Sequence, residues 1–307
     1  MLGDCPPKTG EMMRIKHSPT QDESEAVIGI EGLERPLTLM QITDSHVVAA
    51  DQRDPEALEA VPRFDQIFHE QEPGGVAQQP FFQQALDRSN DLAVDCTILT
   101  GDIIHFPALA AVEMLEQGLK GLASPYLYTL GNHDWHFPHL AWNDTTRQEH
   151  YPRLAHLLGQ SPAAQMLQLG GVRLIALDNS NYQMTDQQLD FLRLQLQTGE
   201  PCVLFVHIPL YTPALAPAVF EKWKTPIMMA ASGWTEQMRA KWLVRESDAS
   251  TLACHEFLTG ADFDNLVGVF CGHVHFAHAG ELRPGCIQYV TRENFGGGYR
   301  VIRLNPL

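Results

Sequence analysis

The sequence lacks several features that would place it in familiar classes of protein. None of its six cysteines forms a C-x-x-C pair, and Cys96, Cys202 and Cys271 stand in apolar, strand-like runs. We therefore expect buried thiols in a reducing compartment and no disulfide framework. No apolar run is long enough to span a bilayer, and the first residues hold no apolar core of signal-peptide length. These absences predict a cytoplasmic protein without a membrane partner.

Positive charge is also scarce. The chain has 21 Lys and Arg residues against 37 Asp and Glu residues, which gives a formal net charge of -16, and no basic run occurs. Such a surface repels a polyphosphate backbone, so we expect no stable binding to long nucleic acids. A small anionic substrate is not excluded, because bound metal cations can dominate the field inside a cleft.

The pattern of apolar residues indicates alternating strands and helices along most of the 307 residues. Strands are predicted at 25–30, 37–42, 96–100, 126–130, 166–169, 172–178, 202–208, 266–270, 287–293 and 299–304, and helices at 81–93, 108–122 and 189–197. Thr185 and Gln188 form a capping-box signature before the last helix. The alternation predicts a layered α/β fold with sheets covered on both faces, and the length allows one large domain or two ordinary ones. Residues 1–24 are polar and are expected to form a loose segment.

Two long segments allow more than one interpretation. Residues 51–79 are mostly polar, contain Pro55, Pro62, Pro73, Gly74 and Gly75, and are expected to form a surface loop or a flap. Residues 211–262 contain three tryptophans and several methionines. This second segment is interpreted as a cap over a cleft, as a contact in a homo-oligomer, or as a helical excursion packed on the sheet edge.

Polar residues that can bind metal recur where apolar strands end. They stand in the runs "LMQITDSH", "TILTGD", "YLYTLGNHD", "LFVHIP" and "GVFCGHVH". Each run alone has an ordinary explanation, since Gly-Asp and Gly-Asn favour turns and a single histidine after a strand is usually structural. Together they place carboxylates, imidazoles and one carboxamide at five strand ends, where active sites of α/β proteins collect. Such nitrogen and oxygen ligands suit divalent metals and predict a dinuclear site.

The order D-x-H, G-D, G-N-H-D, single His and G-H-x-H, from Asp44 to His275, resembles the calcineurin-like metallophosphoesterase superfamily. The resemblance implies an α/β fold of α+β type, a four-layer αββα sandwich in which two mixed β-sheets are flanked by helices, as a single domain over residues 25–307. It implies that one metal is held by Asp44, His46 and His275, that the other is held by Asn132, His207 and His273, and that Asp102 bridges the two. It also implies that His133 faces the substrate and that Asp134 fixes the tautomer of His133.

The chemistry implied is phosphoester hydrolysis by two divalent or mixed-valence metal ions, manganese, iron or zinc. Metals about 3.5–4 Å apart clamp an in-line displacement, and a hydroxide between them is the expected nucleophile. His133 would serve the departing oxygen, which is worth about 10²–10⁴-fold if it acts as a general acid. His105 and His136 lie beside the motifs and are candidates for contact with the substrate phosphate, or are structural.

The motifs also narrow the branch of the superfamily. "GDIIHFPA" and "LGNHD" depart from the pattern of protein Ser/Thr phosphatases, and the compact motif set looks more like the bacterial class of cyclic-nucleotide and glycerophosphodiester phosphodiesterases. The expected substrate is therefore a small soluble phosphodiester. A phosphomonoesterase acting on a small metabolite or nucleotide is the alternative. A non-catalytic metal-binding scaffold is a third hypothesis, although His133 and all seven ligands are present.

Overall fold

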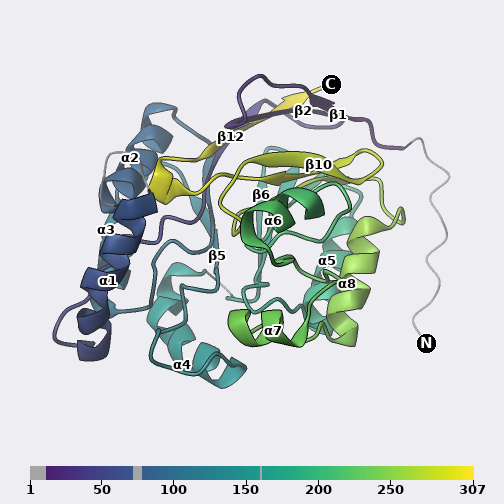
Figure 1. Cartoon of the computed structure of the whole chain (residues 1–307). Coiled ribbons are helices and arrows are strands. Elements are labelled where there is room, and N and C mark those ends of the chain that lie inside the picture. The colour runs from purple at the N-terminus through teal and green to yellow at the C-terminus, as the bar shows by residue number, and fades with distance from the viewer. Residues whose placement is uncertain (1–11, 72–77, 160) are drawn as a thin grey trace.

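The computed structural model describes residues 12–71, 78–159 and 161–307, and these residues build two mixed sheets flanked by helices (Figure 1). The first sheet has the order β1 (Ile15–Ser18), β2 (Glu25–Ile30), β12 (Arg300–Pro306), β3 (Leu37–Ile42), β4 (Cys96–Thr100) and β5 (Tyr126–Thr129). The second has the order β10 (His278–Arg283), β11 (Cys286–Val290), β9 (Leu266–Cys271), β8 (Cys202–Phe205), β7 (Val172–Leu177) and β6 (Ala164–Leu169).

Helices flank the two sheets. They are α1 (Pro55–Gln71), α2 (Gln78–Asp91), α3 (Leu109–Lys120), α4 (Asp144–Leu154), α5 (Asp186–Leu196), α6 (Ala216–Trp223), α7 (Glu236–Trp242) and α8 (Ala249–Thr259). Leu86 of α2 and Leu115 of α3 pack on the first sheet, and Leu192 of α5 and Leu258 of α8 pack on the second. The predicted αββα sandwich is confirmed.

The core between the sheets explains why the central strands are apolar on both faces. Ile98 of β4 faces a cluster that includes Phe205 of β8 and Phe270 of β9. The other faces of the same strands pack against helices. The described cysteines, Cys96, Cys202, Cys254, Cys271 and Cys286, are free and buried, which confirms that the thiols predicted to be buried serve as core residues.

Strand direction decides where the polar loops meet. β3, β4 and β5 run parallel to one another, and β7, β8, β9 and β11 are likewise parallel. The five predicted ligand motifs follow β3, β4, β5, β8 and β9, so each lies at the carboxyl end of a parallel strand. The carboxyl ends of parallel strands share one edge of a sheet, and the two sheets bring their edges together.

Two expectations about the first 80 residues need correction. Much of the segment expected to be a loop or flap, 51–79, is the helix α1, although residues 72–77 lie outside the described residues. Pro55 is the first residue of α1, where a missing N–H is harmless. The expected loose segment contains β1, which pairs antiparallel with β2, while residues 1–11 lie outside the described residues.

Residues 211–262, called the insertion segment below, contain α6, α7 and α8. Leu215, Val219 and Ile227 are buried in the same cluster as strands of the second sheet, so the insertion segment packs onto the molecule along its length. A backbone bridge from Leu210 to Met229 closes its first loop. Within the described ranges, no helix combines the length and the apolar character needed to cross a membrane.

Candidate metal centre

The backbone turns sharply at most of the predicted ligands. Five of the seven predicted ligands adopt the left-handed backbone conformation that residues other than glycine rarely adopt: Asp44 (φ 53°), His46 (φ 45°), Asp102 (φ 53°), His273 (φ 71°) and His275 (φ 55°). This conformation costs about 1–3 kcal/mol at a residue of this kind and collects at functional sites. The strand ends are therefore bent to aim side chains, at a cost in stability.

Two glycines of the motifs allow the loops to approach one another closely. A Cβ atom on Gly272 would overlap Thr43 Oγ1 and Asp44 Oδ2, and one on Gly131 would overlap Asp102. Gly272 N–H donates to the His207 carbonyl at 3.0 Å. The glycines of G-H-x-H and G-N-H-D thus let β3, β4 and β5 converge with β8 and β9 at one point.

The structure brings the first predicted group of ligands together. Asp44 Oδ1 lies 3.2 Å from His275 Nε2 and 3.8 Å from His46 Nε2. The two imidazole nitrogens are 3.3 Å apart. One ligand atom from each of these three residues falls within 4.8 Å of the others, as a single cation requires.

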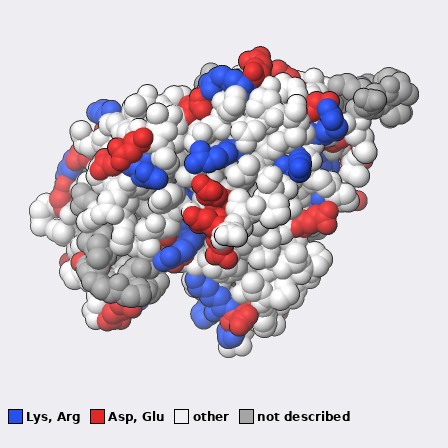
Figure 2. All heavy atoms as spheres, turned by 90° about the horizontal axis from the view of Figure 1, so that it is seen from above, with Lys and Arg blue, Asp and Glu red and all other residues white. Residues whose placement is uncertain are grey.

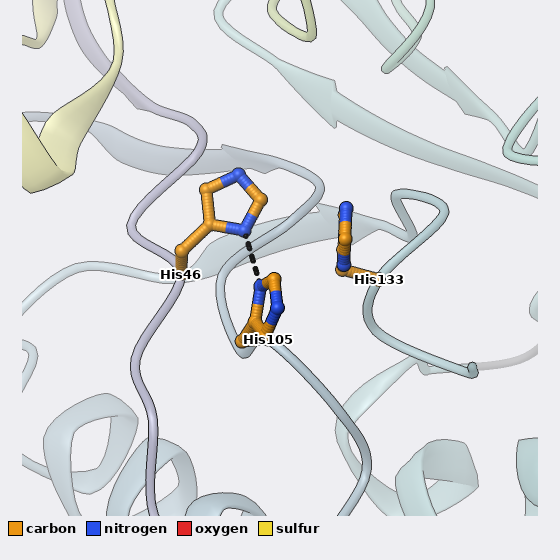
Figure 3. Close-up of side chains that lie close together, drawn as sticks. All are labelled: His46, His105 and His133. Carbon is orange, nitrogen blue, oxygen red and sulfur yellow. Dashed lines mark hydrogen bonds between the residues drawn. The ribbon is translucent and has the colours of Figure 1, made fainter. Parts of the chain in front are cut away.

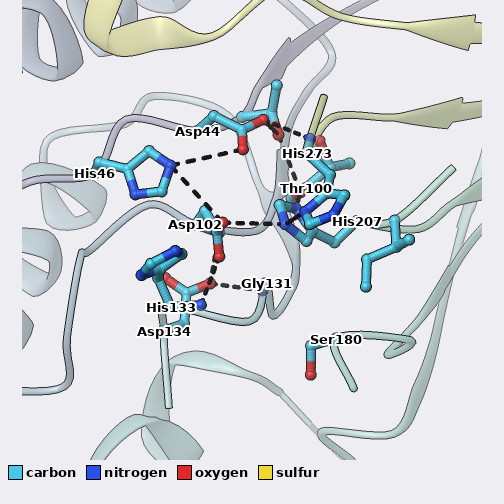
Figure 4. Close-up of polar contacts among 12 residues, drawn as sticks. Asp44, His46, Thr100, Asp102, Gly131, His133, Asp134, Ser180, His207 and His273 are labelled. Atoms are coloured by element: carbon cyan, nitrogen blue, oxygen red, sulfur yellow. Dashed lines mark hydrogen bonds and ion pairs between the residues drawn. The ribbon is translucent and has the colours of Figure 1, made fainter. Parts of the chain in front are cut away.

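The second group forms around Asp102 (Figure 4). Asp102 Oδ2 lies 3.2 Å from His207 Nε2, and His207 Nε2 lies 3.2 Å from His273 Nδ1. The same Oδ2 lies 3.7 Å from His46 Nε2 of the first group. Asp102 therefore stands between the groups, as the resemblance implies, but with one oxygen facing both. Its other oxygen accepts the backbone N–H of His133 at 2.7 Å.

Three of the histidines have their other ring nitrogen held by the protein. His207 Nδ1 lies 2.8 Å from the Thr100 carbonyl, and His273 Nε2 lies 2.7 Å from the Tyr182 hydroxyl. His46 Nδ1 lies 3.1 Å from His105 Nδ1. Metal-binding histidines are oriented in this way, because a partner on one nitrogen fixes the tautomer that leaves the other free to bind.

Two buried oxygens fit metal ions. Asp44 Oδ1 and the side-chain oxygen Asn132 Oδ1 are buried and make no hydrogen bond with the described residues. An unsatisfied buried acceptor is costly unless a cation or water meets it. With imidazole nitrogens around them, these oxygens form a donor set for manganese, iron or zinc. Cys271 is not part of it, because its thiol points to the Tyr289 carbonyl at 3.4 Å.

The electrostatics of the site also favour positive charge. Burial alone would lower the pKa of His207, but the carboxylates of Asp102 and Asp44 overcome it and raise that pKa to about 9. Burial would raise the pKa of Asp102, yet the imidazoles of His207 and His133 hold it well below its ordinary value. With no cation bound, a proton on His207 partly balances the two carboxylates.

His133 points toward the ligands and is backed by His105 (Figure 3). Their rings stack, with centroids 4.3 Å apart and planes inclined by 21°. Burial lowers the pKa of His133, with the Asp102 carboxylate acting in the opposite direction. His105 is only 5% exposed and is hydrogen-bonded to His46. These contacts fit the structural alternative for His105, in support of His46 and His133, and contact with the substrate phosphate stays a prediction.

Asp134 has a different role from the one that the resemblance implies. Its carboxylate accepts three backbone N–H groups, from Asp102 at 2.8 Å, Ile104 at 3.0 Å and Gly131 at 2.7 Å. Asp134 therefore ties the loop after β4 to the loop after β5, and no hydrogen bond to the His133 ring is found among the described residues. The expectation that it fixes the tautomer of His133 is corrected accordingly.

Sequence reasoning missed several supporting residues. Phe68 of α1 stacks on His46 with centroids 5.0 Å apart, and Phe295 closes another side at 5.7 Å. Asn179, just after β7, accepts the backbone N–H of His207 at 3.2 Å. Asn179 and Tyr182 carried the same signal as the ligands, since both follow an apolar strand. Phe68 and Phe295 carried no such signal, because their spacing in the sequence is that of ordinary core residues.

A cavity of about 320 Å³ opens directly over the ligands. Its lining includes His46, Asp102, Asn132, His133, His136, His273 and His275. His136 therefore does reach the cavity, although its Nε2 is engaged with the Leu140 carbonyl at 3.0 Å. A larger and more open hollow of about 580 Å³ lies elsewhere, beside Asp22 and Arg292, and contains none of the predicted ligands.

Comparisons with known proteins agree with this geometry. The family model described as calcineurin-like phosphoesterase matches residues 37–277. The fold is similar to that of a dimetal phosphatase from Danio rerio, with 13% identity, a TM-score of 0.50, and coverage of 85% of this chain and 88% of that one. It is also similar to a purple acid phosphatase from yellow lupin (Lupinus luteus) seeds, with 13% identity and a TM-score of 0.51. That match covers 89% of this chain and 47% of the lupin chain. At such identity the likeness establishes the fold alone. A search of curated proteins gave no match.

Proposed function

The chain belongs to the calcineurin-like phosphoesterase family, and on that premise we propose that it hydrolyses a small soluble phosphodiester with two metal ions. The observation that carries the proposal is the pair of ligand groups joined by Asp102 Oδ2, at 3.2 Å from His207 and 3.7 Å from His46. Asp44, His46 and His275 would hold one cation, and Asn132, His207 and His273 the other. Bound divalent cations supply Lewis acidity toward phosphoryl oxygens and lower the pKa of a water toward about 7.

The remaining residues position the reaction. His133 lines the cavity beside Asn132 and Asp102, so its ring faces a phosphoryl group held over the ligands. Because burial lowers its pKa, the ring is neutral near pH 7 and donates a single N–H. That N–H would donate a hydrogen bond to a phosphoryl oxygen or to the departing oxygen. Asp134 holds the loops that fix the separation of Asp102 and His133.

The charge of the cavity supports a diester over a monoester. Lys241 is the only lysine or arginine among its lining residues in the described part of the chain. A diester carries one negative charge, whereas a monoester near neutral pH carries up to two and gains more from additional cationic side chains. A second ester group also adds surface that can contact walls away from the metal ligands.

Other features of the proposal come from charge and composition. On the face shown in Figure 2, acidic and basic side chains are interspersed. With the net charge of -16, this mixed surface supports a small ester as the partner in place of a nucleic-acid polymer. A cytoplasmic location, ions of manganese, iron or zinc, and a homo-oligomer stay predictions from the sequence.

The test compares two esters that share one leaving group. The manganese-loaded protein is given p-nitrophenyl methyl phosphate, a diester, and p-nitrophenyl phosphate, a monoester. The proposal expects a higher kcat/KM for the diester. Faster turnover of the monoester would establish the phosphomonoesterase alternative. Turnover of neither ester by protein that holds two metal ions would favour the scaffold hypothesis.

A further inference from the structure

One wall of the cavity over the metal ligands is made of tryptophan. Trp223 and Trp242 come from the insertion segment, and Trp142 comes from the loop before α4. All three side chains are half-buried, unlike Trp135, which is fully enclosed in the core. The insertion segment therefore contributes ring surface that lines the site and is not buried in the core.

The tryptophan wall is fixed relative to the metal ligands. Trp223 Nε1 donates to the carbonyl of Val274 at 2.8 Å, and Val274 stands between the ligands His273 and His275. The Trp223 ring lies edge-on to His275, with centroids 5.4 Å apart. Lys222 Nζ donates to the carbonyl of His275. The wall is thus attached to the same loop that carries two ligands.

The polar edges of the rings are already occupied. Trp242 Nε1 donates to Thr225 Oγ1 at 3.2 Å, and the Trp242 and Trp223 rings meet at 82° with centroids 5.6 Å apart. With their N–H groups engaged, both indoles offer carbon and π surface, although Lys222 Nζ lies 5.7 Å from the Trp223 ring centroid and Lys241 Nζ lies 6.0 Å from the Trp242 ring centroid. Such surface favours flat aromatic groups through stacked or edge-to-face contact.

Hydrogen-bonding groups in the same wall are few. The Tyr182 hydroxyl is held by His273, and His136 Nε2 is held by the Leu140 carbonyl. Apart from the metal ligands and His133, Lys241 is the lining residue in the described part that retains a charged end. A polyhydroxylated group such as glycerol would lose hydrogen bonds to water here and regain few.

We propose that the substrate carries a flat aromatic group next to its phosphoryl group, and that Trp142, Trp223 and Trp242 bind that group. This inference rests on the proposed function, because the metal ligands place the phosphoryl group. The cavity volume of about 320 Å³ lies at the lower end for ligand pockets, which suits a single ring system attached to a phosphoryl group. Stacking on aromatic side chains gives about ten- to a hundredfold in affinity per ring.

Three phosphonates that cannot be hydrolysed separate aromatic binding from size and from phosphoryl binding. Phenylphosphonate, cyclohexylphosphonate and methylphosphonate are titrated calorimetrically into the full-length, manganese-loaded protein. The inference expects phenylphosphonate to bind about ten- to a hundredfold more tightly than methylphosphonate, and several-fold more tightly than cyclohexylphosphonate. Equal binding of the phenyl and cyclohexyl compounds would overturn the aromatic assignment.

Variants of the wall provide the second measurement. Trp242→Ala should remove most of the preference for the phenyl compound while the affinity for methylphosphonate stays at the wild-type value, and Trp242→Phe should keep part of it. Phe220→Ala is the matched control, since Phe220 is 49% exposed on the same insertion segment and is not a lining residue. The methylphosphonate affinity also reports whether each variant is folded around its metals.

The outcomes distinguish failure of the aromatic-group inference from failure of the proposed function. If all three phosphonates bind equally while nitrophenyl esters are hydrolysed, the inference is wrong and the proposed function stands. If none of them binds to the manganese-treated protein, the metal centre and the proposed function fail as well. If Trp242→Ala kept the wild-type preference for phenylphosphonate, the Trp242 side chain would not be part of the binding surface. That result would contradict the inference.

Discussion

The ligand loops and the insertion segment use the same backbone conformation for different purposes. In the loops, Asp44, Asp102 and His273 have positive φ and carry the side chains proposed to bind metal. In the insertion segment, Lys224 and Leu243 have positive φ at the C-caps of α6 and α7, where helices commonly end in this way. A residue with positive φ that follows a parallel strand and points into the site marks a functional position. A residue with positive φ after the last turn of a helix marks only the end of that helix.

The two regions also differ in what stabilises them. The ligand loops bring two carboxylates and several imidazoles into a buried space and leave Asp44 Oδ1 and Asn132 Oδ1 without hydrogen bonds. The insertion segment buries Leu215, Val219 and Ile227 against the second sheet. The loops therefore need a cation to be fully satisfied, whereas the insertion segment is held by ordinary apolar burial. Changes in the loops should affect metal binding, whereas a change at Trp242, which lines the cavity from the insertion segment, should affect ligand preference.

The largest effect is expected from Asp102→Asn. The amide removes a negative charge between the two ligand groups, so both cations lose their shared partner. Metal content measured by mass spectrometry should fall below two ions per chain, and kcat/KM should fall by more than about 10³-fold. Phe220→Ala is the control from the insertion segment, because Phe220 is exposed and does not line the cavity, and this variant should keep both ions. Full metal occupancy and activity in Asp102→Asn would contradict the assignment of Asp102 as the bridge.

His133→Ala tests whether a loop residue can act without holding metal. We expect kcat to fall by about 10²–10⁴-fold, because the departing or phosphoryl oxygen loses its hydrogen-bond donor. Metal content should stay near the wild-type value. Loss of metal from this variant would show that His133 is a ligand and that the division of roles is wrong.

His105→Ala tests the support behind the ligands. His105 lies 3.1 Å from His46 Nδ1 and stacks on His133, so its loss should free the His46 ring to rotate. Manganese affinity measured by calorimetry should weaken about 10–100-fold, and His105→Gln should restore part of it by replacing the hydrogen bond. A loss of turnover with unchanged manganese affinity would point instead to direct contact with substrate.

The smallest expected effect is the release of a proton from His207 when metal binds. The pKa of His207 is raised from its usual 6.5 to about 9 in the metal-free site, so the imidazole is protonated below that pH and must lose its proton to bind metal. Metal affinity should therefore rise with pH up to about 9 and then level off. Calorimetry at about pH 7.5 in buffers of different ionisation enthalpy should reveal a released proton. Identical heats in all buffers would contradict this account.

The ligand loops could be predicted from the sequence because each needs particular residue types at a strand end. Asp44, Asp102 and His207 each follow an apolar run that could only be a buried strand. The roles of neighbouring residues could not be predicted, because they depend on how each loop turns. Asp134 faces backbone amides in place of the His133 ring, and only coordinates reveal that difference.

Proline and glycine in residues 51–79 predict a loop, whereas much of this segment forms the helix α1. Ala57, Val61, Phe64 and Phe68 nevertheless follow helical spacing, and Phe68 reaches His46. The function of the insertion segment could not be predicted for another reason. A tryptophan that lines a cavity and a tryptophan that fills a core look the same in a sequence, and the distinction between Trp223 and Trp135 lies in exposure alone.

The central claim is that seven side chains hold two cations with Asp102 between them. A crystal of the manganese-loaded protein, measured at the manganese absorption edge, tests this claim most directly. The account predicts two anomalous peaks, one among Asp44, His46 and His275 and one among Asn132, His207 and His273, about 3.5–4 Å apart. A single peak, or peaks away from these residues, would contradict it.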